Sequence, residues 1–161
     1  MTIAALMAVM LLSATLLFHF TVLRWLSGGM ARIPMTPALR VFIIVITVLI
    51  VHLIEVLLYA AAYAVGQVYF EIGGFAGEAI NGPLDYLYFS IVSYTSLGIG
   101  DIFPSDHLRF ITGIEALNGL LLIAWSGSFI FTAMARLWPW EKCVETGGGQ
   151  HGGSVDMKKG S

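Results

Sequence analysis

Two glycines one residue apart, Gly98 and Gly100, lie in the segment Thr-Ser-Leu-Gly-Ile-Gly-Asp at residues 95–101. Glycine adopts left-handed backbone conformations that other residues avoid. This spacing therefore lets the chain alternate between ordinary and left-handed dihedral angles, which turns successive carbonyl oxygens to one side. Rings of carbonyl oxygens around an axis can replace the water shell of a cation. The segment predicts a backbone site for a bare cation.

The composition indicates a membrane protein. Of the 161 residues, 58% are hydrophobic and only 11% are charged, whereas a soluble domain carries about 25% charged residues. The single cysteine, Cys143, excludes an intramolecular disulfide and a cysteine-based zinc site. The eight Lys and Arg residues form no basic stripe, so no nucleic-acid partner is expected. Nothing pairs a nucleophile with a base or forms a phosphate loop, so we expect no enzyme activity, no small-molecule substrate and no cofactor.

Three apolar stretches are long enough to cross a bilayer, which takes roughly 20 helical residues. They cover about residues 3–26, 38–65 and 108–137. A fourth stretch, residues 84–94, is too short to span and is interpreted as a re-entrant helix. The sequence Asn-Gly-Pro that ends at Pro83 is a helix-start signal in front of it. The first stretch has no Lys or Arg before Arg24, so we expect a retained helix and not a signal peptide.

The basic residues predict the orientation. The positive-inside rule places loops rich in Lys and Arg in the cytoplasm. The segment between residues 66 and 108 is acidic and has no Lys or Arg before Arg109, so we expect it outside. The protein is thus expected to be a multi-pass protein of the cell (plasma or inner) membrane, with its N-terminus outside and its C-terminus in the cytoplasm. The basic residues that set this orientation are Arg24, Arg32, Arg40, Arg136 and Lys142.

Residues 88–104, Tyr-Phe-Ser-Ile-Val-Ser-Tyr-Thr-Ser-Leu-Gly-Ile-Gly-Asp-Ile-Phe-Pro, resemble the pore loop of tetrameric potassium channels. The usual signature there is Thr-Thr-Val-Gly-Tyr-Gly-Asp with a proline three residues later. The resemblance covers roughly residues 38–138 and adds one N-terminal span to the two-helix module. It implies an all-α membrane protein with three transmembrane helices, a re-entrant pore helix and a filter loop in each subunit. It also implies a homotetrameric pore in the lipid bilayer.

The resemblance and the apolar stretches together set the expected domain boundaries. We expect an extra N-terminal transmembrane helix at residues 1–27, a cytoplasmic linker at 28–37, a pore module at 38–140 and a flexible cytoplasmic tail at 141–161. Within the pore module we expect an outer helix at 38–66, an extracellular turret at 67–82, a pore helix at 83–94, a filter at 95–101 and an inner helix at 107–138.

The same resemblance implies a role for each filter residue. The Ser96 hydroxyl would complete the innermost ion site, and Asp101 would brace the filter at its outer mouth. The expected permeant ion is a monovalent cation, most simply potassium, and no other metal is expected. The backbone carbonyls that would bind it belong to Ser96, Leu97, Gly98 and Ile99, within an ion-binding segment that also includes Thr95 and Gly100.

Three residues depart from the family pattern. Ile99 replaces a tyrosine and Phe89 replaces a tryptophan, so the hydrogen bond that those two aromatics share in the family is lost. Val92 replaces a glutamate that in some members pairs with the filter aspartate, so Asp101 needs another donor. A weakly selective sodium and potassium channel on the same fold is therefore the nearest alternative function.

The last long stretch carries three further candidate residues. Glu115 is expected to bond pore-helix hydroxyls such as Ser93 or Tyr94 and so to support the filter. Gly119 is a candidate gating hinge, with close helix packing as the alternative. Asn118 is expected to face the pore cavity.

Polar residues within apolar spans are functional candidates by default. His52 and Glu55 are three residues apart and share one helix face, which fits a buried hydrogen-bonded pair or a metal or proton site. If His52 and Glu55 form a metal or proton site, the protein would be a proton- or metal-coupled transport protein. His19 is expected to be a packing residue whose polar atoms are hydrogen-bonded. A non-conducting structural membrane protein is a further alternative, but it leaves residues 81–104 unexplained.

Overall fold

The computed structural model describes residues 1–29 and 33–137. Three helices in this part of the chain are long and apolar enough to cross a membrane. This confirms the expected all-α fold class, with a short helix between the second and third spans. The expectations for the tail, for Cys143 and for part of the linker fall on residues 138–161 and 30–32, which lie outside the described residues. The elements are α1 (Thr2–Gly29), α2 (Pro37–Val68), β1 (Phe75–Gly77), α3 (Pro83–Tyr94), β2 (Ile102–Pro104) and α4 (Leu108–Leu137).

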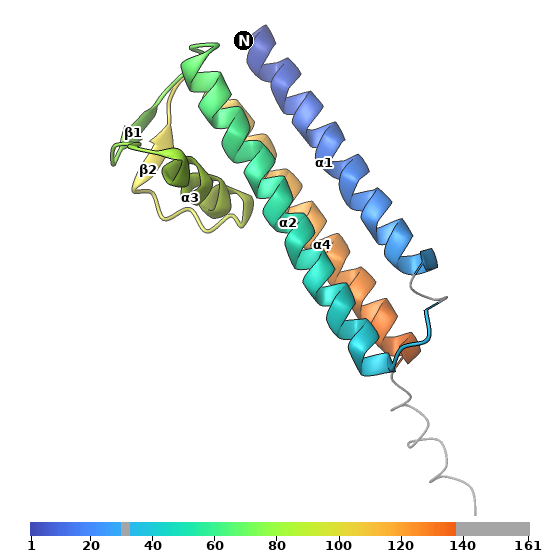
Figure 1. Ribbon diagram of the computed structural model, residues 1–161. Helices are drawn as coiled ribbons and strands as arrows, with labels where there is room; N and C mark the ends of the chain where they lie inside the picture. The colour runs from blue at the N-terminus through green and yellow to red at the C-terminus, as the bar shows by residue number, and fades with distance from the viewer. Residues whose placement is uncertain (30–32, 138–161) are drawn as a thin grey trace, which may run out of the picture.

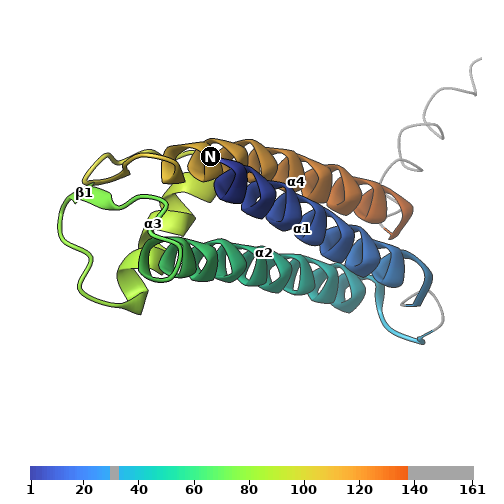
Figure 2. The same ribbon diagram turned by 90° about the horizontal axis from the view of Figure 1, so that it is seen from above.

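The three long helices run side by side, and α3 lies beside one end of them (Figure 1). The N-terminus of α1 lies at the same end of the bundle as α3 and the two short strands. Seen along the perpendicular direction, α1 lies against both α2 and α4 (Figure 2). The short helix therefore reaches only part of the way along the bundle, as a re-entrant helix must.

Local signals explain where α2 and α3 begin. Each starts with a proline in its first turn, Pro37 and Pro83, where the missing N–H costs nothing and the fixed φ suits a helix. In α3 the Asp85 carboxylate accepts hydrogen bonds from the backbone N–H groups of Asn81, at 2.7 Å, and Gly82, at 3.0 Å. A carboxylate there satisfies otherwise unpaired amides and complements the positive end of the helix dipole.

An aromatic cluster joins α3 to the rest of the subunit. The Phe89 ring packs edge-on against Phe75 and Tyr63, with centroid separations of 4.8 and 5.1 Å. Two small residues of α1, Ala4 and Ala8, are buried against the same core. Small side chains let helices approach closely in a membrane. This packing fixes the N-terminal end of α1 next to the short helix.

The chain that leaves the 95–101 segment is held by a two-stranded antiparallel ladder. Phe75 pairs with Pro104 and Gly77 pairs with Ile102. Gly77 has a φ of 95°, and a Cβ atom there would collide with the Asp101 carbonyl oxygen. The ladder continues as the Glu78 N–H donates to that carbonyl at 2.9 Å. The glycine thus permits the close approach that anchors residue 101.

Candidate ion-conduction site

The backbone of residues 95–101 alternates in handedness. Ser96, Gly98 and Gly100 have positive φ angles of 58°, 58° and 84°. The two glycines adopt this region without strain, whereas a serine rarely does. Every second residue is therefore left-handed, and this is the alternation that the glycine spacing predicts.

The first N–H groups of this segment are hydrogen-bonded, whereas its carbonyl oxygens have no partner within the described residues. The N–H groups of Ser96 and Leu97 donate to carbonyls at the end of α3, each at 2.9 Å. Across residues 1–29 and 33–137, no hydrogen bond is accepted by a carbonyl oxygen of residues 96–100. All the residues from Thr95 to Gly100 are exposed in the isolated subunit. The segment thus presents a ladder of partial negative charge.

Asp101 has a partner that the sequence did not reveal. The Tyr88 hydroxyl donates to Asp101 Oδ2 at 2.7 Å, and the Ile102 N–H donates to Oδ1 at 2.9 Å. The hydrogen bond from Tyr88 holds the pKa of Asp101 below its ordinary value, and the same bond raises the pKa of Tyr88. Tyr88 precedes Val92 by four residues, so the two share a helix face. That spacing was the available signal for the missing donor.

Val92 and Phe89 support the segment differently from one another. The Val92 carbonyl accepts the N–H of Leu97 at 2.9 Å and lies 3.5 Å from that of Gly98, so Val92 supports the filter through its backbone. Phe89 is buried and packs on Phe75 and Tyr63. In contrast, the Ile99 residue is 56% exposed in the subunit.

Glu115 braces α3 from α4, but through other residues than expected. It is fully buried, and its Oε1 lies 2.5 Å from the Ser90 hydroxyl. The Tyr63 hydroxyl bonds its other oxygen. The expected bond to a pore-helix hydroxyl is therefore confirmed, but the examples Ser93 and Tyr94 are replaced by Ser90, because the α3 face that meets α4 at this depth carries Ser90, about one turn earlier.

Gly119 and Asn118 both serve helix packing. A Cβ atom on Gly119 would collide with the Tyr94 carbonyl oxygen, so the glycine lets α4 approach the end of α3. Its role as a hinge stays a prediction. Asn118 is 1% exposed and donates to Thr15 at 2.8 Å and to Tyr59 at 3.2 Å. It therefore faces α1 and α2, and the expectation that it faces a cavity is wrong.

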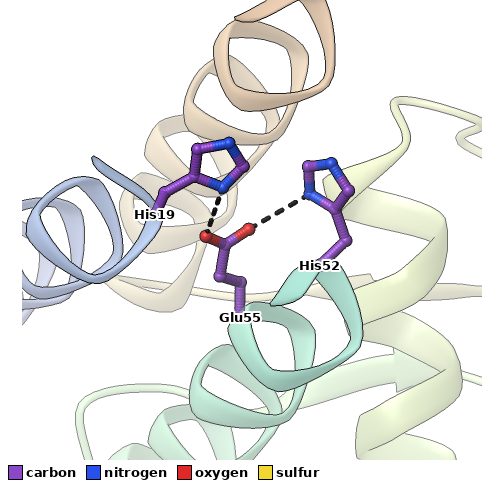
Figure 3. A group of neighbouring side chains, drawn as sticks. All are labelled: His19, His52 and Glu55. Carbon is purple, nitrogen blue, oxygen red and sulfur yellow. Dashed lines mark hydrogen bonds and ion pairs between the residues drawn. The ribbon is translucent and has the colours of Figure 1, made fainter. Parts of the chain in front are cut away.

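A second polar cluster lies between all four helices. Glu55 Oε1 lies 2.9 Å from His19 Nδ1, and Oε2 lies 3.1 Å from His52 Nδ1 (Figure 3). The Tyr94 hydroxyl donates to Oε2 at 2.6 Å and lies 2.9 Å from His52 Nδ1. Ser126 Oγ contacts the far nitrogens, His52 Nε2 at 3.1 Å and His19 Nε2 at 3.0 Å. We call these five residues the intramembrane network.

The network bears on two sequence interpretations. His52 and Glu55 form the hydrogen-bonded pair that their spacing indicates. His19 is completely buried, and both of its ring nitrogens have partners, Glu55 and Ser126, as expected of a satisfied packing residue, although the sequence did not indicate these partners. A contact between residues 36 positions apart depends on how α1 and α2 are docked, and no local pattern reveals it.

One comparison with known proteins identifies a family for this chain. The model of a protein family described as "Ion channel" matches residues 51–136. That range holds 86 of the 161 residues, more than half of the chain. It includes most of α2, all of α3, the 95–101 segment and nearly all of α4, but not α1. No curated protein and no solved structure matches the chain. The chain belongs to the ion channel family.

Proposed function

We propose that the protein conducts monovalent cations passively across a membrane, with potassium as the permeant ion, through a pore made by four copies of the chain. The observation that carries the proposal is the alternating backbone of residues 96–100 together with its unpaired carbonyl oxygens. A row of carbonyls without donors suits a cation that has shed its water.

In this mechanism the backbone supplies the coordination. The carbonyls of Ser96, Leu97, Gly98 and Ile99 replace water around the ion, and the Ser96 hydroxyl completes the innermost site. The C-terminal end of α3 adds partial negative charge where the segment begins. Asp101, held by Tyr88, keeps the outer end of the segment in place. No covalent step and no cofactor is needed.

The limits of a bilayer support an assembly of several subunits, and the number four is taken from the resemblance to tetrameric potassium channels. Irregular backbone at membrane depth is stable only when protein buries it or when it lines water. A single subunit leaves residues 95–100 exposed, together with large apolar side chains of α4 such as Leu117 and Phe131. Four subunits around one axis would place the segment on a water-filled path and cover part of these surfaces. The arginine distribution supports an orientation with the α3 end outside, and the membrane we propose is the cell membrane.

The decisive test is ion flux into liposomes that contain the purified protein. Wild type is expected to pass potassium, and Gly98→Ala is expected to abolish flux. No atom lies within 4 Å of a Cβ atom at Gly98, but its φ is 58°, so the change tests backbone handedness alone. The matched control is Gly113→Ala in α4, where the Cβ atom also meets nothing within 4 Å. Equal flux in wild type and Gly98→Ala would contradict the proposal.

A weakly selective cation channel is the second candidate. It is favoured by the exposure of Ile99 and by the packing of Phe89 on Phe75 and Tyr63, since neither residue supplies a hydrogen bond behind the filter. Reversal potentials in potassium against sodium separate the two functions. A reversal potential that follows the potassium gradient supports selectivity, and one that ignores it supports the second candidate. Flux lost in His52→Ala but kept in Gly98→Ala would instead indicate coupled transport.

A further inference from the structure

The contacts within the intramembrane network determine how many protons its side chains must carry. Glu55 is surrounded by three potential donors, His19 Nδ1, His52 Nδ1 and the Tyr94 hydroxyl, at 2.6 to 3.1 Å. Three hydrogen bonds directed at a carboxylate favour its ionised form. Both imidazoles therefore carry a proton on Nδ1, the nitrogen that faces Glu55.

The contacts of Ser126 require more protons than two neutral imidazoles can supply. Its hydroxyl oxygen lies 3.0 Å from His19 Nε2 and 3.1 Å from His52 Nε2. A hydroxyl has one proton and can donate to only one of these nitrogens. If both Nε2 atoms were bare, one nitrogen lone pair would face the oxygen lone pairs of Ser126. An unsatisfied polar contact of this kind is costly in a buried site.

One additional proton satisfies the whole network. With one imidazole doubly protonated, that ring donates to Ser126 and Ser126 donates to the other ring. All six short contacts are then hydrogen bonds, with the His52 Nδ1 proton shared between Glu55 Oε2 and the Tyr94 oxygen. The imidazolium also cancels the charge of Glu55, so the cluster is neutral overall. Neutrality matters because an uncompensated charge inside a membrane protein is expensive.

The network is mechanically linked to the candidate filter. Tyr94 is the last residue of α3, and Thr95 follows it as the first residue of the 95–101 segment. The Tyr94 side chain bonds Glu55, and its backbone carbonyl lies against Gly119. The far end of the network is His19, on α1, which lies outside the family match. A change in the proton count thus reaches the start of the filter through a single residue.

We infer that the intramembrane network is a proton-binding site, and that His19 is a positioning residue through which α1 holds the end of the pore helix. The effect on conduction rests on the function proposed above. The groups that face His19 are Glu55 and His52 from α2 and Ser126 and Trp125 from α4. Tyr94 from α3 faces His52 and Glu55. Glu115 of α4 is bonded instead to Ser90 and Tyr63.

The direction of the pH effect follows. The network gains a proton that neutral imidazoles would lack, so it is complete at lower pH and loses that proton as the pH rises. Loss leaves a net negative charge and an unpaired contact between Ser126 and one imidazole. It therefore weakens the packing of α4 against α1 and α2, which keeps Glu55 in place beside Tyr94. Potassium flux is expected to fall as pH rises through this transition.

Nitrogen NMR of the full chain in lipid bilayers tests the site independently of conduction. With ¹⁵N-histidine label, His19→Gln and His52→Gln assign the signals, because glutamine keeps hydrogen bonding but takes no proton. The expected result is a signal of a doubly protonated imidazole from this pair, which disappears at high pH. Two singly protonated rings at every pH between 5 and 9 would overturn the inference. A histidine signal that changes only when Zn²⁺ is added, and not with pH, would also overturn the inference. It would indicate a metal site, because the donor atoms of His19, His52 and Glu55 lie within 4.8 Å of one another.

Liposome flux against pH tests the coupling. His19→Gln is expected to remove the pH dependence, whereas Thr21→Ala, an exposed hydroxyl of α1 bonded to its own helix, is the matched control and should keep it. An unchanged pH profile in His19→Gln overturns the positioning role. If wild type carries no flux at any pH, the proposed function fails while the NMR titration still decides the proton site. Thermal melting of each variant in detergent separates misfolding from loss of coupling.

Discussion

Tyr88 donates a hydrogen bond to Asp101 at 2.7 Å and so connects the middle of α3 to the outer end of the 95–101 segment. The two residues are 13 positions apart and lie on either side of the candidate filter. The bond therefore closes a loop around that filter inside one subunit. In this chain, where Ile99 and Phe89 provide no side-chain hydrogen bond, it is the direct polar brace between pore helix and filter exit.

Removing this brace should reduce selectivity before it reduces flux. Tyr88→Phe deletes only the hydroxyl, so the ring packing stays while Asp101 loses its charge-assisted bond. We expect the potassium-to-sodium permeability ratio to fall several-fold, measured from reversal potentials in planar bilayers. Tyr86→Phe, which loses a 2.8 Å bond to Gln67 instead, is the matched control. A ratio unchanged in Tyr88→Phe would show that Asp101 does not brace the filter.

The hydrogen bond between Tyr88 and Asp101 should make ion selectivity depend on pH in wild type but not in Tyr88→Phe. Tyr88 lowers the pKa of Asp101, so the ionised form that accepts the bond persists to a pH below about 4, the ordinary pKa of aspartate. The contribution is lost as the pH falls through this lowered pKa. Selectivity of wild type should then approach that of Tyr88→Phe, whereas the variant should show no such step. Reversal potentials measured during acidification of the outer solution check this, and a step of equal size in both proteins would contradict it.

Truncating Glu115 should destabilise the subunit strongly. Glu115→Ala removes the acceptor that the Ser90 and Tyr63 hydroxyls share and leaves a cavity in its place. The two hydroxyls keep the Val56 carbonyl and Thr112 as acceptors, so the cost is that of the cavity plus two lost hydrogen bonds, each worth about 0.5–1.5 kcal/mol. Glu115→Gln keeps an acceptor and should cost much less. Unfolding in mixed micelles measures both, with ion selectivity as a second readout. If Glu115→Gln and Glu115→Ala both match wild type in both measurements, the bracing role is wrong.

A methyl group at Gly119 should displace the end of the pore helix. Gly119→Ala drives a Cβ atom into the Tyr94 carbonyl, and overpacking of a tight contact costs about 1–3 kcal/mol. We expect lower thermal stability and lower flux together. Gly127→Ala, on the same helix with open space around its Cβ position, should behave as wild type. A variant with normal stability and altered gating would favour the hinge alternative.

The permeant ion should stabilise the folded assembly. A ligand that binds only the native state at 100 times its Kd adds about 2.7 kcal/mol. Replacing potassium with a large organic cation should therefore lower the melting temperature of the detergent-solubilised protein, and restoring potassium should reverse the loss. Gly98→Ala should melt at the same temperature in both ions. A wild-type melting temperature independent of the cation would count against binding at residues 96–99.

The spans, the re-entrant helix and the filter backbone could be predicted from the sequence because their causes are local. A run of about 20 apolar residues is itself the requirement for crossing a bilayer. The left-handed positions at Gly98 and Gly100 follow from the side chain that glycine lacks. The left-handed Ser96 has no comparable local cause. It is held by its neighbours in the turn after α3, through the bond from its N–H to the Ser93 carbonyl.

The polar contacts needed the tertiary structure. Successive residues of an α-helix point about 100° apart, so a small rotation or shift of one helix changes which side chain meets which neighbour. For this reason Glu115 meets Ser90 and not Tyr94, and Asn118 meets Thr15, 103 positions away. The sequence by itself determined that this is a membrane protein with a carbonyl-lined segment between two spans. Only the docking of α1 onto α2 and α4 decided that His19 reaches Glu55, because that contact depends on the relative depth and rotation of two helices that no local pattern specifies.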